Sequence, residues 1–375
     1  MKDLQLPHFE YGDVWQRLQK ETRPIVIYGM GNGADKLLAR LNAYGIAYAD
    51  FFASDGFVRG HAFHGKRVLS FSEICQKYTD FVILLSFASA RREVLDLLYG
   101  MSERHPFLMP DLPVAGEQTF DAAFYETYHH DFDFVMNMWA DKTSAEVYSS
   151  VLHYKLSGDI SFLRHCHQDK KEQYALFSCA DVHHAIDVGA YRGDTLKEMA
   201  DFFPSLKSAI AIEPDQKSFQ KLEAFAQIFS FDVQPIRAAA WSHNGNTVFH
   251  ESGNRNSSLV GASYEHVDAS VQLLSLDSLT DATRIDYIKY DVEGAEREAL
   301  LGSASTIRRD RPILAVSLYH RSEDLFALPL LLRERCTDYS FYLRRTECLP
   351  AWELTMIAVP NEKKVIDRMS NTYII

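Results

Sequence analysis

Cysteine is scarce in this chain of 375 residues, and its spacing is irregular. The five cysteines are odd in number, and no two of them form a Cys-x-x-Cys pair. A disulfide framework needs paired cysteines, and a structural zinc site needs ligand pairs at short spacing. The sequence therefore predicts reduced thiols and a cytoplasmic protein.

Long apolar runs and a basic surplus are also missing. The apolar segment Phe81–Ser86 has the length of a strand, and the N-terminus lacks the apolar core of a signal peptide. Lysine and arginine number 39 against 51 acidic residues, which gives a formal net charge of −12. Nonspecific nucleic-acid binding needs a basic surface. The sequence therefore predicts neither a membrane span nor a nucleic-acid partner.

Three segments of different character follow one another. Residues 1–105 alternate strands with helices, which predicts a parallel sheet in a Rossmann-like α/β domain. Residues 106–180 begin with spaced prolines and continue with aromatic-rich helical patterns, which predicts a helical connector. Residues 181–375 return to strand–helix alternation and predict a second α/β domain.

The most informative motif opens this second domain. The apolar strand that begins at His184 ends in Asp187-Val-Gly189, and a turn with a second glycine at Gly193 leads into a helix. Such glycines let a cofactor approach the backbone, and the helix N-terminus offers free N–H groups. The strand Ala209–Ile212 follows and ends at Glu213, an acid placed to accept two ribose hydroxyls.

The spacing of the glycines indicates which cofactor is held. A dinucleotide fingerprint is Gly-x-Gly-x-x-Gly, whereas this turn is Asp-x-Gly-x-x-x-Gly from Asp187 to Gly193. The looser turn resembles the first motif of S-adenosylmethionine (SAM) methyltransferases. An ordinary α/β turn with glycines is the alternative.

Three further predicted strands end in candidate site residues. The third, Val233–Ala240, ends beside Trp241, where small residues suit an adenine ring. A weak hairpin over Asn246–His250 and Ser257–Val260 is followed by the fourth strand, which ends at Asp291. The fifth ends at His320. Ligands of open α/β sheets bind at the carboxyl ends of the strands.

This set resembles the FkbM-type family of SAM-dependent methyltransferases over roughly residues 145 to 360. The motifs that carry the resemblance are Ala185–Thr195, Ala211–Asp215, Ser275–Leu279, Tyr287–Glu296 and Pro312–His320. The resemblance implies a seven-strand methyltransferase sheet, SAM as cofactor, and methyl transfer to oxygen, usually on glycans or secondary metabolites. The predicted acceptor is a hydroxyl of a sugar, either nucleotide-linked or in a surface polysaccharide.

Candidate residues follow from the motif and the strand ends. His320 and Asp291 are the predicted catalytic pair, with His320 as general base because its usual pKa lies near neutrality. The predicted cofactor-binding residues are Asp187, Gly189, Ala190, Tyr191, Gly193, Thr195, Glu213, Pro214, Ala240, Trp241 and Asp291.

Metal binding is weighed and not predicted. Asp291, Glu293 and His320 together have the donor atoms for a divalent ion, but Glu293 and Glu296 also suit the first turn of a helix. The pairs His165/His167 and His183/His184 lack a second ligand pair at zinc spacing.

The first domain carries a fingerprint of its own. Gly29-x-Gly31-x-x-Ala34 follows a strand, and Asp55 ends the next one. With one mononucleotide half and no Tyr-x-x-x-Lys pair, a redox role for NAD is not predicted. A nucleotide or nucleotide-sugar site at Gly29–Ala34 and a docking or dimerising module both stay open. The rivals to a methyltransferase are an idle SAM-binding scaffold and a nucleotide-sugar oxidoreductase.

Overall fold

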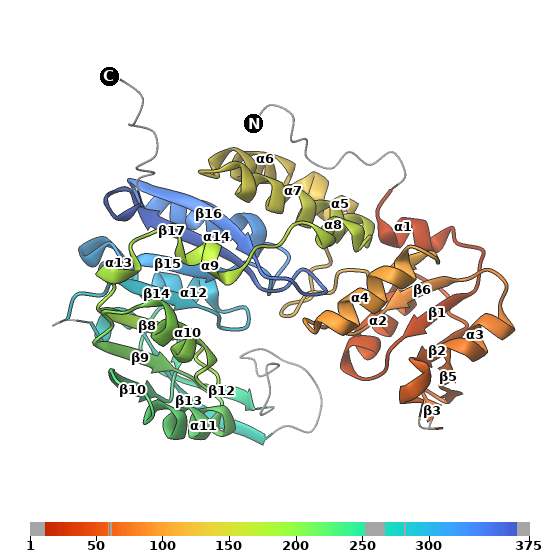
Figure 1. Ribbon diagram of the computed structural model, residues 1–375, viewed down its shortest axis with the longest axis horizontal. Helices are drawn as coiled ribbons and strands as arrows, with labels where there is room; N and C mark the ends of the chain where they lie inside the picture. Colours follow the sequence, from red (N-terminus) through yellow and green to blue (C-terminus); the bar gives the residue numbers. More distant parts are fainter. Residues whose placement is uncertain (1–11, 59, 61, 252–266, 281–282, 366–375) are drawn as a thin grey trace.

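The computed structural model of the protein describes residues 12–58, 60, 62–251, 267–280 and 283–365. Two sheets lie at opposite ends of the molecule, and the connector helices run along one side between them (Figure 1). The mixed α/β class predicted from the sequence is confirmed.

The first unit is a five-stranded sheet with strand order β5-β2-β1-β6-β7, and every strand pair in it is parallel. Its elements are α1 (Val14–Gln19), β1 (Ile25–Tyr28), α2 (Asn32–Ala43), β2 (Asp50–Ala53), β3 (Ala62–Phe63), β4 (Lys66–Arg67), β5 (Leu69–Ser70), α3 (Phe71–Lys77), β6 (Val82–Leu85), α4 (Arg92–Ser102) and β7 (Phe107–Leu108). The edge strand β7 comes from the proline-rich stretch in which the sequence predicts no strand.

The connector contains α5 (Ala122–Thr127), α6 (His129–Met138), α7 (Lys142–Ser157), α8 (Ser161–Arg164) and α9 (Lys170–Tyr174). Gly158 ends α7 in the left-handed conformation with φ +69°, where an added Cβ would lie 2.9 Å from Val14 Cγ2. Glycine is therefore required both for this turn and for the close approach of α1.

The second unit is a seven-stranded sheet with strand order β10-β9-β8-β14-β15-β17-β16, in which only β17 runs antiparallel to both of its neighbours. Its elements are β8 (His184–Val188), α10 (Asp194–Phe202), β9 (Ser208–Ile212), α11 (Gln216–Ala226), β10 (Asp232–Ile236), β11 (Ala239–Ala240), β12 (Gly245–Glu251), β13 (Val267–Leu274), β14 (Tyr287–Tyr290), α12 (Glu296–Leu301), α13 (Ala304–Asp310), β15 (Ile313–Ser317), α14 (Asp324–Arg335), β16 (Tyr339–Arg345) and β17 (Leu354–Pro360). The predicted seven-strand sheet is confirmed.

Two predictions in this unit need correction or fall outside the structure. The third strand leaves the main sheet after Ile236, and Ala239–Ala240 pairs instead with β13 in a separate three-stranded sheet. The predicted hairpin strand Asn246–His250 is present within β12, but its partner is β13. The predicted partner Ser257–Val260 lies outside the described residues.

Alternation along the central strands divides the second unit into two layers. In β8, Ile186 and Val188 face the core that contains α12, α13 and α14, whereas Ala185 belongs to the core of α9, α10 and α11. Successive side chains of a strand point to opposite faces. Asp187 therefore lies on the α10 side, the side on which the glycine turn leads into that helix.

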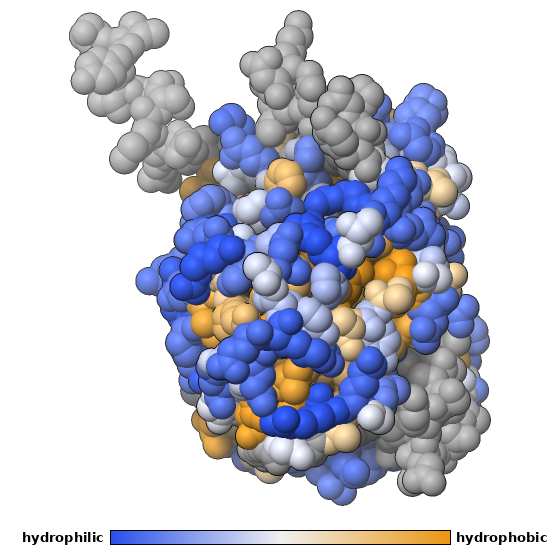
Figure 2. Space-filling model, turned by 90° about the vertical axis from the view of Figure 1, so that its right-hand side faces the viewer, coloured by the Kyte–Doolittle hydropathy of each residue, from blue (hydrophilic) through white to orange (hydrophobic). Residues whose placement is uncertain are grey.

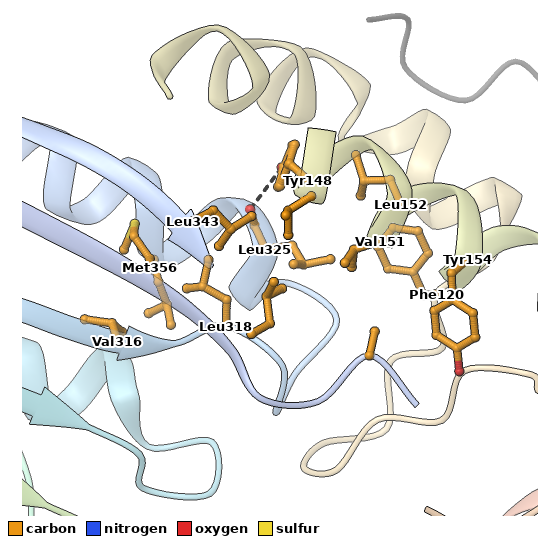
Figure 3. Packing of buried hydrophobic residues seen from close by; sticks show 14 of the residues in the cluster. Phe120, Tyr148, Val151, Leu152, Tyr154, Val316, Leu318, Leu325, Leu343 and Met356 are labelled. Atoms are coloured by element: carbon orange, nitrogen blue, oxygen red, sulfur yellow. Dashed lines mark hydrogen bonds between the residues drawn. The ribbon is translucent and has the colours of Figure 1, made fainter. Parts of the chain in front are cut away.

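One hydrophobic core joins both units through the connector. It includes Val26 and Ile83 of the first sheet, Tyr148 and Val151 of α7, and Val316 of the second sheet. In Figure 3, Tyr148 of α7 lies on the side of the second unit, where its hydroxyl donates to Leu325 O at 3.0 Å, whereas Tyr154 of the same helix points away from the strands. The connector is thus a packed layer that fixes one α/β unit against the other.

The outer face of the first unit differs from this interior. Hydrophilic residues predominate there, and hydrophobic ones form small separate patches (Figure 2). Of the helices that the structure describes, none combines the length and the apolar character that crossing a bilayer demands.

A buried ion pair between α7 and the segment after β7 allows the role of the connector as a fixed layer to be tested. Lys155 of α7 lies 2.6 Å from Asp111, which follows β7, and both side chains are 3% exposed. We expect Asp111→Ala to lower the free energy of unfolding by about 3–5 kcal/mol, because it leaves a buried ammonium unpaired. Urea denaturation measures this change. Glu146→Ala removes the exposed partner of Lys142 on the same helix and serves as the control, which should leave the midpoint unchanged.

Candidate active site

The candidate residues gather at the carboxyl ends of four adjacent strands. The strands β9, β8, β14 and β15 are parallel neighbours, and the chain leaves them through Glu213, Gly189, Asp291 and Leu318. This shared edge is the position where open α/β sheets bind ligands.

The glycine turn after β8 is shaped by packing within the protein. Gly189 has φ +87°, and an added Cβ would lie 1.9 Å from Asp291 O; at Gly193, φ +91°, it would lie 2.7 Å from Phe225 Cδ1. The backbone clash excludes any other residue at Gly189, and the positive φ makes any other residue at Gly193 strained. The glycines therefore draw the turn against the end of β14 and against α11, a role that the sequence motif alone does not reveal.

Glu213 is held by the backbone of that same turn. Its Oε2 accepts from Tyr191 N at 2.8 Å and its Oε1 accepts from Asp215 N at 2.9 Å. Burial raises the pKa of Glu213 to about 8, although these two bonds lower it. Each carboxylate oxygen has two lone pairs, so each can still accept one hydroxyl.

A lysine that the sequence reasoning missed joins two of the candidates. Lys289 is the register partner of Asp187 on the adjacent strand, and its Nζ lies 3.6 Å from Asp187 Oδ1 and 3.3 Å from Asp291 Oδ2. It also donates to Thr195 Oγ1 at 2.9 Å. The signal in the sequence was a charged residue inside the apolar strand Tyr287–Tyr290.

The carboxylates of Asp187 and Asp291 both lie close to the Lys289 ammonium. Burial lowers the pKa of Lys289, but the carboxylates outweigh it and hold the pKa above its usual value. Asp187 is fully buried with no hydrogen-bond partner for either oxygen among the described residues, and burial raises its pKa to about 7. Asp187 is thus a buried carboxylate without hydrogen bonds, held by one charge contact.

Asp291 is the most densely bonded of the candidates. Its Oδ1 accepts from Ser317 Oγ at 2.8 Å and from the Tyr319 hydroxyl at 3.0 Å. Burial raises its pKa, but Lys289, His320 and these two donors outweigh burial and hold the pKa below its usual value. Asp291 is therefore ionised at neutral pH and fixed in direction.

His320 lies beneath this edge, fully buried among carboxylates. Its Nδ1 is 2.8 Å from Glu296 Oε1, and its Nε2 is 3.5 Å from Asp291 Oδ1 and 3.7 Å from Glu293 Oε2. Burial lowers the pKa of His320, but Glu296, Asp291 and Glu293 outweigh it and raise the pKa to about 10. Glu293 itself sits at φ +52°, a strained conformation typical of functional positions.

The other predicted residues lie around this centre or apart from it. Ala190 is fully buried in the turn, and Pro214 follows Glu213. Ala240 ends β11, and Trp241 packs on Ala239, Val271 and Leu273 of the small three-stranded sheet. At the opposite ends of the strands, His183 and His184 hydrogen-bond to Ser205 O and Ser208 Oγ, so they are structural.

The glycines of the predicted fingerprint in the first unit differ in how closely other atoms approach them. An added Cβ on Gly33 would lie 2.0 Å from Ser86 O, so this glycine serves strand packing, whereas Gly31 has open space around it. Asp55 accepts from the backbone N–H of Ser72 at 3.0 Å and is thereby engaged with α3.

The same turn lies near the second unit. Lys36 of α2 donates to Val114 O at 3.2 Å, and burial lowers its pKa while Glu293 raises it. Ala115 N donates to His320 O at 2.8 Å. The connector segment 113–116 therefore lies between α2 and the buried histidine.

Two cavities differ in what lines them. A small one borders the Lys289 group and is lined by Gln173, Tyr174, Thr195, Glu198, Lys289, Asp291, Ser317, Glu353 and other residues. A larger one lies at the amino ends of the first sheet, where Arg23 and Arg164 are paired with Glu21 and Glu103. The small cavity is the one that adjoins the candidate residues.

Comparison with known proteins agrees with this arrangement. A family profile described as "Methyltransferase FkbM domain" matches residues 187–339. The crystal structure of a methyltransferase FkbM from Methylobacillus flagellatus KT aligns with a TM-score of 0.66 at 19% identity, over 90% of this chain and 90% of its own. That alignment shows a shared fold. No curated protein matches the chain.

Two more distant structures align weakly and carry no conclusion about this chain. Fibrillarin from Aeropyrum pernix, with natively bound SAM, aligns at a TM-score of 0.34 and 12% identity, over 50% of this chain and 74% of its own. TrmK from M. capricolum, in complex with S-adenosyl-homocysteine (SAH), aligns at 0.31 and 11%, over 54% and 72%. The family profile is the finding that bears on function: residues 187–339 match the methyltransferase FkbM domain.

Proposed function

We propose that this methyltransferase uses SAM to methylate a hydroxyl group of a sugar, either nucleotide-linked or in a surface polysaccharide. The observation that carries the proposal is the meeting of Glu213, Asp187, Lys289 and Asp291 at adjacent strand ends beside the glycine turn. Bound SAM supplies an activated methyl group on a sulfonium.

The residues of the second unit fit such a cofactor. Glu213 presents a buried carboxylate whose oxygens each retain a lone pair for a ribose hydroxyl. Asp187 has unpartnered buried oxygens within the described structure, so a cationic ligand nearby would offset its charge. Thr195 and Lys289 line the adjoining cavity, where they can hold a carboxylate tail.

His320 and Asp291 are the proposed catalytic pair. Both belong to the strand ends at which an acceptor hydroxyl would have to lie, and 3.5 Å separates His320 Nε2 from Asp291 Oδ1. Positioning two reactants contributes much of the rate in such reactions, on the order of 7–11 kcal/mol in well-oriented systems. Asp291 orients the acceptor, and His320 takes the proton of its hydroxyl in the neutral form, which the raised pKa of about 10 makes the minor form at neutral pH.

The first unit supports an acceptor with a phosphate. The open backbone at Gly31 begins the twelve-residue helix α2, whose N-terminus attracts anions. Lys36 lies in the second turn of α2, where burial lowers its pKa and the nearby charge of Glu293 raises it. A nucleotide-linked sugar with its phosphates at Gly29–Ala34 can therefore direct its sugar toward the second unit.

The cofactor proposal is tested by calorimetry with SAH at several pH values. The hydroxyls of ribose donate best to an ionised carboxylate, and Glu213, with a pKa of about 8, is protonated below that pH. We therefore expect SAH affinity to rise between pH 6.5 and 8.5, by up to about 25-fold if only the ionised form binds. Glu213→Gln should bind weakly at every pH and lose this slope. An equal slope in both proteins would assign the titration to another group, and no heat at millimolar SAH would refute the cofactor.

The catalytic proposal is tested by turnover. The wild type is incubated with SAM and a panel of nucleotide sugars, and SAH release is measured. His320→Ala should then lower turnover roughly a hundredfold or more and leave the dissociation constant of SAH nearly unchanged, because proton transfer acts in the transition state. Asp291→Asn should impair both, since Asp291 also contacts Lys289. Full turnover in His320→Ala would remove His320 from the reaction.

A further inference from the structure

The start of β17 brings one more carboxylate to the shared edge of the second sheet. Because β17 runs antiparallel to β15, it begins where β15 ends, and Thr355 is the register partner of Ser317. The pairing continues for one more residue, since Leu318 N donates to Leu354 O at 2.9 Å. Glu353 is the residue before Leu354, so it lies at the strand ends that carry the candidate residues.

The side chain of Glu353 faces these residues. It borders the small cavity that Lys289 and Asp291 also line. Burial lowers the pKa of Lys289, but nearby carboxylates, Glu353 among them, outweigh it. Burial raises the pKa of Tyr319, and Asp291 and Glu353 raise it further. Glu353 is therefore close to two groups that contact Asp291.

The backbone at Glu353 is held in a strained conformation. Its φ is +55°, in the left-handed region that residues with a side chain rarely adopt. Six non-glycine residues of the described chain have a positive φ, and three of them, Tyr191, Glu293 and Glu353, lie at the candidate site. Strain of this kind persists where the surrounding structure enforces it, and it clusters at functional sites. The surrounding structure thus fixes the place of Glu353.

The strand order assigns this end of the edge to the acceptor. Glu213 and the glycine turn, where the proposed cofactor binds, follow β9 and β8, and Asp291 follows the next strand, β14. The strand β17 lies two positions beyond β14, which corresponds to about 10 Å. A sugar ring whose reacting hydroxyl lies at Asp291 can therefore extend toward Glu353, away from the cofactor.

The chain just before Glu353 also contacts the first unit. Ser89 N donates to Leu349 O at 2.8 Å, and Leu349 N donates to Ser89 O at 2.9 Å. Ser89 belongs to the loop after β6. Phe87 of the same loop packs on the glycine fingerprint, where an added Cβ on Gly29 would lie 2.8 Å from its Cδ1. One loop therefore contacts both the predicted nucleotide turn and the segment that leads to Glu353.

We propose that Glu353 binds hydroxyl groups of the acceptor sugar and selects it, in a nucleotide-linked sugar whose nucleotide lies toward the first unit. This assignment rests on the proposed function. The two oxygens of a carboxylate can accept two neighbouring hydroxyls of one ring, and hydrogen bonds to a charged group are stronger than those between neutral partners. A sugar that lacks these hydroxyls would leave the carboxylate unsatisfied, which is how such a site discriminates.

The proposal is tested by calorimetry on the full chain, with and without SAH. The probes are UDP-glucose, UDP-galactose, GDP-mannose and dTDP-glucose, each compared with its free nucleoside diphosphate. We expect at least one nucleotide sugar to bind more tightly than its nucleotide alone. Glu353→Gln should weaken that sugar about tenfold or more, because charge-assisted bonds are lost. The Kd of the free nucleotide and that of SAH should stay nearly unchanged.

Glu334→Gln is the matched control, since it removes a carboxylate from the exposed side of α14 and should keep every wild-type Kd. Glu353 is half-buried, so its variant should fold, as circular dichroism will verify. Glu353→Asp keeps the charge and should weaken the sugar less than Glu353→Gln, which separates a role in binding from one in folding.

Three outcomes would overturn the proposal: no nucleotide sugar bound at millimolar concentration, an unchanged sugar Kd in Glu353→Gln, or a loss of SAH affinity in that variant instead. The first two leave the cofactor proposal standing, because SAH binding is measured separately. A wild type that binds a nucleotide sugar but no SAH would refute the cofactor and leave the assignment of Glu353 standing.

Discussion

The ammonium of Lys289 is the interaction on which the rest of the site depends. It comes from the middle of a buried strand, and its register places it beside Asp187 on one neighbour and Asp291 at the end of its own strand. Without it, the carboxylates of Asp187 and Asp291 would lie close together with no cation between them, which favours a proton on one of them. The close approach of Gly189 to Asp291 O follows from the same junction, because the turn after β8 packs directly onto the end of β14. The glycine turn and the acids that Lys289 holds therefore meet at one junction, between β8 and β14.

A second constraint lies outside the site, in the connector. Helix α7 packs on β16 and β17, which cover the edge of the second sheet beyond β15, and its core continues into the first sheet. The backbone bridge between Ser89 and Leu349 joins the two units directly as well. Shared hydrophobic packing of this extent opposes hinge motion. The N-terminal turn at Gly31 consequently keeps a fixed position relative to His320, which a flexible tether would not provide.

The sequence was sufficient to predict the site residues whose position follows from the end of a strand alone. Gly189, Glu213, Asp291 and His320 each end or follow a strand, and parallel strands bring their ends together without further information. It was insufficient to predict roles that depend on a contact with a residue far away in the sequence. The role of Lys289 depends on register with Asp187, and the bonds of Glu213 depend on the turn at Tyr191. The sequence also did not predict that Ala239–Ala240 leaves the main sheet. A strand that crosses to another sheet has the same residue pattern as one that continues in the first.

The strand ends carry more carboxyl groups than cationic groups, and this excess bears on the stability of the folded protein. Asp187, Glu213, Asp291, Glu293 and Glu296 bring five carboxyl groups to this region, against the two cationic groups Lys289 and His320. Burial opposes ionisation of Asp187 and Glu213, whose pKa values rise to about 7 and about 8. The sulfonium of the proposed cofactor is a cation, so it would offset carboxylates that the protein alone leaves under-compensated. Ligands that bind only the folded state stabilise it by mass action. The burial that raises the pKa values of Asp187 and Glu213 therefore also favours a positively charged ligand beside them.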